Sequence, residues 1–325
     1  MRATGPQILR AVTLMLLVVA ACPGQSPEPV DTLRIDSDLV DLKVSVVSLN
    51  PRSPSAELQQ KDFTVFEDGQ PQDISFFAAA ETPFDLVLLI DLSQSSNNKL
   101  QLIRKSANRF VEATRPADRV SIVAFANQAQ LICPMTQDRR LLKKSIDNIQ
   151  EPQGGTRFWD SLRYVLAILN ASANSTRRSA VVVMTDGVDN ALPDVFGEGS
   201  STSFEKLLQI VRDSDAIVFP IYLDTEDEEY KRHRTPRSAF ALAREQLGQI
   251  AAASGTRLFR AQKLKDLDDV YEQVIGDLGR IYSIGYRPSN SQRDGKWRSV
   301  AVRVHDGHDV AVRTKPGYFA RALPN

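Results

Sequence analysis

The sequence predicts an α/β fold: a doubly wound, mostly parallel sheet that is inserted in, or flanked by, a small antiparallel β domain. Three observations lead to this expectation. Apolar runs at 84–90, interrupted only by Asp85, and at 180–184 indicate strands that are covered on both faces. Amphipathic helical stretches alternate with these runs, as the crossovers of a parallel sheet require. Polar and apolar residues alternate over 39–47, which instead indicates a half-buried strand.

The N-terminal residues have the pattern of an export signal. Two arginines precede the apolar run 11–21, which is too short to span a bilayer but fits the hydrophobic region of a secretory signal. Small residues before Cys22 resemble a bacterial lipobox, whose cysteine is lipidated. The alternative is ordinary cleavage near these alanines, which would leave a soluble secreted protein. We expect residues 1–22 to be a signal peptide, and we favour the lipoprotein type over ordinary cleavage. Residues 23–31 are expected to be a flexible linker.

Both ends of the remaining chain are expected to be β-structure. Residues 32–81 contain two β segments on either side of Asp68-Gly69, which is a strong hairpin signal. Residues 282–325 repeat this arrangement around Asp306-Gly307. Single hairpins are marginal in water, so we expect the two ends to pack together as one β domain.

Residues 82–281 are expected to form the α/β domain. Its predicted strands are 84–90, 120–125, 129–133, 180–184, 217–223 and a short one near 257–259. Its predicted helices are 99–114, 139–149, 158–169, 203–212, 238–253 and 264–278. The third strand follows a short turn and should pair antiparallel at an edge. In the strand order 3-2-1-4-5-6 the first and fourth strands are neighbours, and a cleft forms at their carboxyl ends.

Charge and cysteine content exclude several classes of function. Forty basic residues balance forty acidic ones, so no overall field attracts nucleic acid or an anionic membrane. Membrane contact is expected only through the lipid anchor. Cys133 is the only cysteine besides Cys22, so no internal disulfide is expected, and we predict that Cys133 is a small buried hydrophobe.

Oxygen-bearing side chains follow the first and fourth predicted strands. Asp91, Ser93 and Ser95 come directly after the first strand, and Asp186 follows the fourth. Thr156 lies in the loop before the 158–169 helix, over the same cleft. Carboxylate and hydroxyl oxygens are the ligands of hard divalent cations, so this pattern predicts a metal site without histidine or thiolate.

The order and spacing of these residues resemble a known family. Asp91-x-Ser93-x-Ser95, Gly154-Gly155-Thr156 and Thr185-Asp186-Gly187 together resemble the metal-ion-dependent adhesion site (MIDAS) of a von Willebrand factor type A (VWA) domain. The resemblance covers residues 82–281. The flanking strands are similar to those of bacterial VWFA-related proteins that are abundant in Acidobacteria.

The resemblance implies a Rossmann-like sheet whose site binds Mg²⁺, with Mn²⁺ or Ca²⁺ left open, and recruits a protein ligand. Ser93, Ser95 and Thr156 would bind the cation directly, whereas Asp91 and Asp186 would act largely through water. An Asp or Glu of the partner would complete the coordination. The expected partner-binding rim comprises Gln94, Gly155, Gly187 and Asp189.

Other interpretations remain open at this stage. The two aspartates could merely cap helices while the serines satisfy a turn. A hydrolase or phosphotransfer enzyme could use Asp91 as nucleophile, although Ser93 stands where such enzymes need a second carboxylate. A third possibility is a structural envelope lipoprotein. We expect a binding module for adhesion or scaffolding rather than an enzyme, with the charged stretch 224–237 contributing to partner selectivity.

Overall fold

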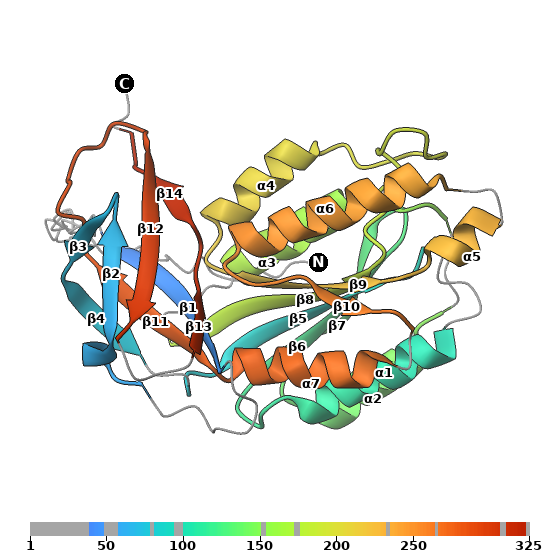
Figure 1. Ribbon diagram of the computed structural model, residues 1–325. Helices are drawn as coiled ribbons and strands as arrows, with labels where there is room; N and C mark the ends of the chain where they lie inside the picture. Colours follow the sequence, from blue (N-terminus) through green and yellow to red (C-terminus); the bar gives the residue numbers. More distant parts are fainter. Residues whose placement is uncertain are drawn as a thin grey trace, which may run out of the picture. The chain divides into compact units, whose positions relative to one another are not determined.

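The computed structural model describes residues 39–48, 58–78, 81–93, 100–150, 154–171, 176–231, 235–263, 266–305 and 310–322 (Figure 1). Residues 38–325 form one compact unit, and the fold given below is that of this unit. Cys22, Gln94 and Ser95 lie outside the described residues. None of the described helices combines the length and apolar character that crossing a membrane requires.

A six-stranded sheet forms the centre of the α/β part (Figure 1). Its strands are β5 (Phe84–Asp91), β6 (Arg119–Phe125), β7 (Ala129–Thr136), β8 (Arg178–Thr185), β9 (Ile217–Leu223) and β10 (Phe259–Ala261). They lie in the order β10-β9-β8-β5-β6-β7, and only the pairing of β6 with β7 is antiparallel. This confirms the predicted fold class, the neighbouring first and fourth strands, and the antiparallel edge.

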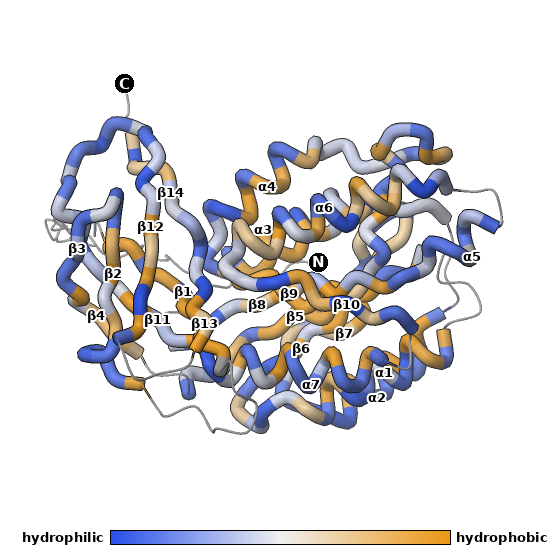
Figure 2. The backbone as a smooth tube through the Cα atoms, viewed as in Figure 1, coloured by the Kyte–Doolittle hydropathy of each residue, from blue (hydrophilic) through white to orange (hydrophobic). Residues whose placement is uncertain are grey.

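Helices cover both faces of this sheet (Figure 1). One face carries α1 (Leu100–Ala113), α2 (Arg139–Asp147) and α7 (Leu267–Leu278); the other carries α3 (Phe158–Ala171), α4 (Phe204–Asp213) and α6 (Arg237–Ala253). Alternate residues of each strand therefore enter two separate apolar cores, which explains why the central strands carry hydrophobic residues on both faces (Figure 2). Cys133 is fully buried in the first of these cores, as predicted.

The β part contains two four-stranded antiparallel sheets. One has the order β13-β1-β11-β4 and the other β14-β12-β2-β3. Their bounds are β1 (Val40–Ser48), β2 (Phe63–Glu67), β3 (Gln70–Gln72), β4 (Ile74–Ala78), β11 (Ile281–Tyr286), β12 (Trp297–Val304), β13 (Val310–Arg313) and β14 (Gly317–Phe319), with a short 3₁₀ helix at Gln60–Asp62. Both sheets contribute to one apolar core, and strands from the two ends of the chain pair in each.

The strand pairing corrects the two expected hairpins. Asp68 and Gly69 do form a turn with positive φ at both residues, but it joins β2 to the short β3. The chain then leaves this sheet, because β4 pairs with β11 in the other one. On either side of 306–307, β12 and β13 likewise belong to different sheets. The residues that join them, 306–309, lie outside the described ranges.

Arg178 connects the β part to the central sheet. This buried side chain is the first residue of β8, and it donates to the hydroxyl of Ser283 (2.9 Å) and to the carbonyls of Ile281 (2.6 Å) and Ala78 (3.1 Å). Its guanidinium also lies over the ring of Phe84, 5.8 Å from the centroid. Burial lowers the pKa of Arg178 to about 10, which leaves it charged at neutral pH.

Candidate functional site

Asp91 and Asp186 lie at the carboxyl ends of two adjacent parallel strands. Asp91 is the last residue of β5, and Asp186 directly follows β8. Both are buried, with 3% and 4% of their surfaces exposed. The position corresponds to the point where the chain direction of a doubly wound sheet reverses, which is the usual ligand position in such folds.

Hydrogen bonds fix the carboxylate of Asp91. Its Oδ1 accepts from the N–H of Ser93 (2.8 Å) and its Oδ2 accepts from the hydroxyl of Thr185 (2.6 Å). The Thr185 oxygen in turn accepts from the N–H of Gly187 (2.9 Å). The loop after β5 and the loop after β8 are therefore joined through Asp91.

Asp186 is held in a comparable way. Its Oδ1 accepts from the N–H of Val188 (3.1 Å), and its Oδ2 accepts from the hydroxyl of Thr225 (2.7 Å), which lies just beyond β9. The contacts of Asp91 to Ser93 and of Asp186 to Val188 are local turn bonds. Such bonds would also form if the two aspartates only stabilised their loops. The second oxygen of each carboxylate, however, faces a hydroxyl from a neighbouring strand end.

Thr156 lies in the loop before α3, which is joined to the loop after β8 by hydrogen bonds. Its N–H donates to the side-chain oxygen of Asn190 (3.2 Å), and its carbonyl accepts from the N–H of Asn190 (2.9 Å). The loop that carries Thr156 is thus bonded to the loop that carries Asp186. The structure brings Asp91, Ser93, Thr156 and Asp186, all buried, to these three connected loops.

Gly187 is required by the backbone at this point. Its φ is +76°, and a Cβ would lie 2.8 Å from Cδ1 of Leu247 on α6. Any other residue would strain the turn and require the Leu247 side chain to shift, so glycine allows the Asp186 loop to pack closely on α6.

Two of the expected rim residues are not on an exposed rim. Gly187 and Asp189 are both buried. Asp189 accepts from the N–H groups of Trp159 (3.0 Å), Ala191 (2.9 Å) and Ser200 (2.9 Å) and from the Ser200 hydroxyl (2.6 Å). Its carboxylate therefore caps the first turn of α3 and shapes the following loop. Gly155 is half-buried, and its N–H donates to Asn127 Oδ1 (2.7 Å).

The charged stretch 224–237 contains a helix that the sequence analysis did not anticipate, α5 (Glu226–Lys231). Glu226 forms ion pairs with Arg244 (2.7 Å) and Arg237 (3.3 Å). Thr225, which donates to Asp186, immediately precedes this helix, so the stretch is connected to the site by a direct hydrogen bond.

The electrostatics of the site favour a bound cation. Burial, and secondly the negative charge of Asp186, raise the pKa of Asp91 to about 7, against the pull of the Ser93 and Thr185 hydrogen bonds. Two buried like charges repel each other, and a divalent cation would reverse this penalty. Within the described part of the chain, no three His, Cys, Asp or Glu side chains converge as a metal group. A cation here would therefore take hydroxyl oxygens as well, and the donors present fit Mg²⁺ in chemical type.

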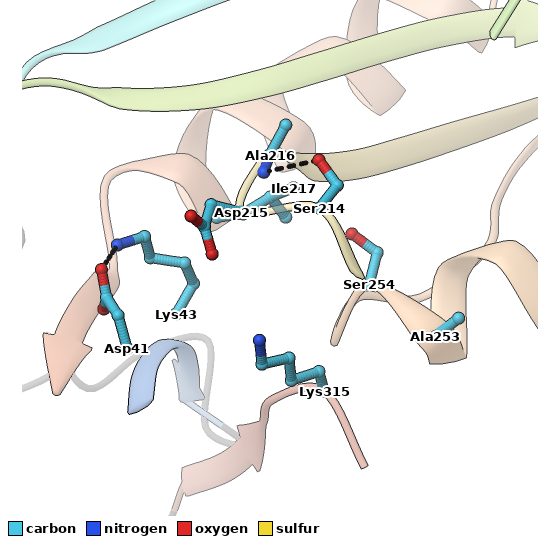
Figure 3. A pocket seen from close by; sticks show the side chains of 9 residues that line it. All are labelled: Asp41, Lys43, Ser214, Asp215, Ala216, Ile217, Ala253, Ser254 and Lys315. Atoms are coloured by element: carbon cyan, nitrogen blue, oxygen red, sulfur yellow. Dashed lines mark hydrogen bonds and ion pairs between the residues drawn. The ribbon is translucent and has the colours of Figure 1, made fainter. Parts of the chain in front are cut away.

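A small hollow lies at the amino-terminal end of the sheet, opposite the end that carries Asp91 and Asp186. Lys43, Asp215 and Lys315 border it, and Lys43 is paired with Asp41 at 2.5 Å (Figure 3). Its volume is about 20 Å³, enough for about one water molecule. This hollow is too small for an organic ligand and lies apart from the paired aspartates.

The same segment matches a known family. A family model described as the von Willebrand factor type A domain matches residues 86–188, a span that runs from β5 through the loop of Asp186. The chain carries a von Willebrand factor type A domain. This match supports the resemblance to a VWA domain that the sequence motifs indicated.

Several relatives share low identity with this VWA protein. The collagen alpha-1(VI) chain of Gallus gallus is 23% identical over 203 residues, which cover 55% of this chain and 19% of the collagen chain. An uncharacterized protein of Borreliella burgdorferi is 29% identical over 114 residues, or 33% of each chain. A UPF0353 protein of Nocardia farcinica is 22% identical over 236 residues, covering 67% of this chain and 68% of that protein. The chain thus spans less than two thirds of the first two relatives.

Solved structures include a von Willebrand factor type A protein from Catenulispora acidiphila, with 12% identity and a TM-score of 0.48 over 82% of this chain and 76% of that one. Proximal thread matrix protein 1 from the mussel byssus, described with a zinc-occupied MIDAS motif, has 21% identity and a TM-score of 0.47 over 64% of this chain and 48% of its own.

Proposed function

We propose that this VWA protein is an exported, metal-dependent binding module for adhesion or scaffolding. Mg²⁺, or Mn²⁺ or Ca²⁺ in its place, would be held by Asp91, Ser93, Thr156 and Asp186, with Ser95 added by the resemblance. The observation that carries the proposal is the convergence of two buried carboxylates with hydroxyls from adjoining loops at the carboxyl ends of β5 and β8.

The residues of the site have distinct roles in this proposal. Thr185 and Thr225 orient the two carboxylates, and Asn190 positions the loop that presents Thr156. Hydroxyl donors leave a cation with more positive charge than an all-carboxylate shell would. The bound cation would supply the positive charge to which an Asp or Glu of a protein partner is attracted.

A binding role agrees better with these residues than an enzymatic one. Ser93 occupies the position at which a phosphotransfer enzyme would carry a second carboxylate. Asp91 is almost fully buried, and its raised pKa weakens it as a nucleophile near neutral pH. A structural envelope lipoprotein, in which the cation only stiffens the loops, is the remaining alternative.

Export is proposed from the signal-like pattern of residues 1–22, with Cys22 as the lipidation site. The protein would then lie in the cell envelope, lipid-anchored in the periplasm, or be secreted if cleavage occurs without lipidation. We also assign the flanking β-strands to the bacterial VWFA-related group named above, on the basis of their sequence pattern.

Capture of a partner from envelope extract tests the proposal. The immobilised protein should retain a partner in Mg²⁺ and release it when EDTA is added. Asp186→Asn should capture none, whereas Asp189→Asn, which changes a buried carboxylate outside the proposed ligand set, should still respond to Mg²⁺. Capture that is indifferent to EDTA would contradict metal-bridged binding. Stabilisation by Mg²⁺ without any metal-dependent capture would favour the structural alternative.

A further inference from the structure

A groove of about 770 Å³ opens beside Asp91, between the carboxyl ends of β5 and β6, the edge strand β7 and the end of α2. Its volume is within the range of about 300–1,000 Å³ that is usual for ligand sites. None of the described residues that line it is charged, although a quarter of the whole chain is. By contrast, most residues that line the hollow between α1 and α2 are charged.

The wall of the groove adjoins the loops of the candidate metal site. Leu92, which lies between Asp91 and Ser93 in the sequence, is part of its wall, and its N–H donates to the carbonyl of Phe125 (2.8 Å) in the same wall. Asn127, also in the wall, accepts from the N–H of Gly155 (2.7 Å), next to Thr156. A ligand whose carboxylate reached the metal site could therefore extend directly into the groove.

The wall formed by β7 exposes a strand edge. β7 is the outermost strand of the sheet, and three consecutive residues, 130–132, line the groove. Consecutive strand residues point to opposite faces, so a groove that touches all three runs along the edge of the strand. Ile132 also has no counterpart on β6, because the register shifts between the pairs of Ile122 with Cys133 and Val123 with Leu131. A free strand edge offers backbone groups that an extended peptide can pair with.

The side chains of the groove suit an uncharged peptide. Five carboxamides line it, and each can both donate to and accept from a peptide backbone: Asn127, Gln128, Gln130, Asn148 and Gln150. Leu131 adds an apolar contact that is 47% exposed. A charged side chain would lose water here without gaining a counter-charge, which disfavours it.

We propose that an extended, uncharged segment of the partner, adjacent in sequence to the acidic residue that reaches the metal site, lies in this groove. This inference rests on the proposed function, because the acidic residue fixes the register of the segment. It specifies the sequence expected in the partner: an acidic residue followed or preceded by residues such as Gln, Asn, Ser, Leu or Val.

Selection from a displayed library of short random peptides, each with one fixed central aspartate, tests the groove. The library is retained on the full-length protein in Mg²⁺ and eluted with EDTA. Enriched peptides are then measured against Leu131→Glu, Leu131→Lys and the control Leu141→Glu. Leu141 is 42% exposed, close to the 47% of Leu131, but lies on α2 outside the groove. Melting curves and Mg²⁺ affinity confirm that each variant retains its fold and its metal site.

We expect enriched peptides to carry an uncharged run on one side of the aspartate. Both Leu131 variants should bind them at least about ten-fold more weakly, and Leu141→Glu should bind them like wild type. Stronger binding by Leu131→Lys would indicate attraction to the aspartate across space and would overturn the groove proposal. Mg²⁺-dependent peptides that bind both Leu131 variants normally, or that carry charges beside the aspartate, would also overturn it and leave the proposed function standing. If no peptide requires Mg²⁺, both proposals fail.

Discussion

Replacing Asp186 with asparagine should stabilise the metal-free protein and abolish its response to Mg²⁺. The amide can keep both hydrogen bonds of the side chain, because Oδ1 can accept from Val188 (3.1 Å) and Nδ2 can donate to the Thr225 oxygen (2.7 Å). The substitution therefore removes a charge with little change in shape. The two effects have opposite signs because the Asp186 carboxylate repels Asp91 in the metal-free protein but attracts a cation when one is present.

The magnitude follows from the pKa of Asp91. Burial and the Asp186 charge raise this pKa from 3.8 to about 7, which at about pH 8 costs the folded, metal-free protein about 4 kcal/mol. Burial is the larger cause, so the charge of Asp186 accounts for the smaller share of this cost. In a domain of this size about 1 kcal/mol shifts Tm by about 2–4 °C. Wild type should gain about 3 kcal/mol in Mg²⁺ at about 100 times Kd, a gain that the variant lacks.

Calorimetric melting in EDTA and in Mg²⁺ measures both effects. Asp189→Asn is the matched control. The amide leaves one of the N–H groups that donate to Asp189 without its acceptor, so this variant should have a lower Tm both in EDTA and in Mg²⁺. Its Tm should still rise when Mg²⁺ is added. Near pH 5 Asp91 is protonated in the folded wild type, so the advantage of Asp186→Asn in EDTA should disappear. A lower Tm for Asp186→Asn in EDTA at about pH 8, or a full Mg²⁺ shift in this variant, would refute the reasoning.

Three further outcomes are expected. Thr225→Val removes the hydroxyl bound to Asp186 and should weaken Mg²⁺ binding several-fold, as measured by titration calorimetry; unchanged affinity would remove Thr225 from the site. Arg178→Met leaves the carbonyls of Ile281 and Ala78 without their donor, so urea unfolding should show a loss of about 2–4 kcal/mol with Mg²⁺ affinity unchanged. Between about pH 4 and pH 7 the folded, metal-free protein binds more protons at Asp91 than the unfolded chain, so its stability in EDTA should fall as the pH rises, and Mg²⁺ affinity should increase over the same interval. A stability in EDTA that increases with pH over this interval would contradict the raised pKa of Asp91.

The central sheet could be predicted because its sequence signals agree with one another. Each buried strand is predominantly apolar, and turn residues separate it from amphipathic helices. The order of the strands then places the loops of Asp91 and Asp186 side by side without further information. The short β-strands were less predictable. Period-two alternation locates a strand but does not identify its partner, so the sequence could not show that β3 and β4, or β12 and β13, belong to different sheets.

The hydrogen bonds that support the site also could not be predicted from the sequence. Thr185 was visible as part of Thr-Asp-Gly, but its bond to Asp91 depends on the twist and spacing of β5 and β8. Thr225 had a weaker signal, a hydroxyl just past a strand that neighbours β8. The burial of Asp189 depends on the fold of the loop up to Ser200, where two of its bonds form. A polar residue after a strand indicates nearness to the cleft, but not whether its side chain faces a ligand or the backbone.

Anomalous diffraction from crystals soaked in Mn²⁺ tests the central claim most directly. We expect one strong peak at the carboxyl ends of β5 and β8, within coordination distance of Ser93 and Thr156 and beside the carboxylates of Asp91 and Asp186. The same soak of Asp186→Asn should give no peak there. An absent peak in wild type, or a Mn²⁺ ion bound elsewhere while this cleft holds only water, would contradict the account.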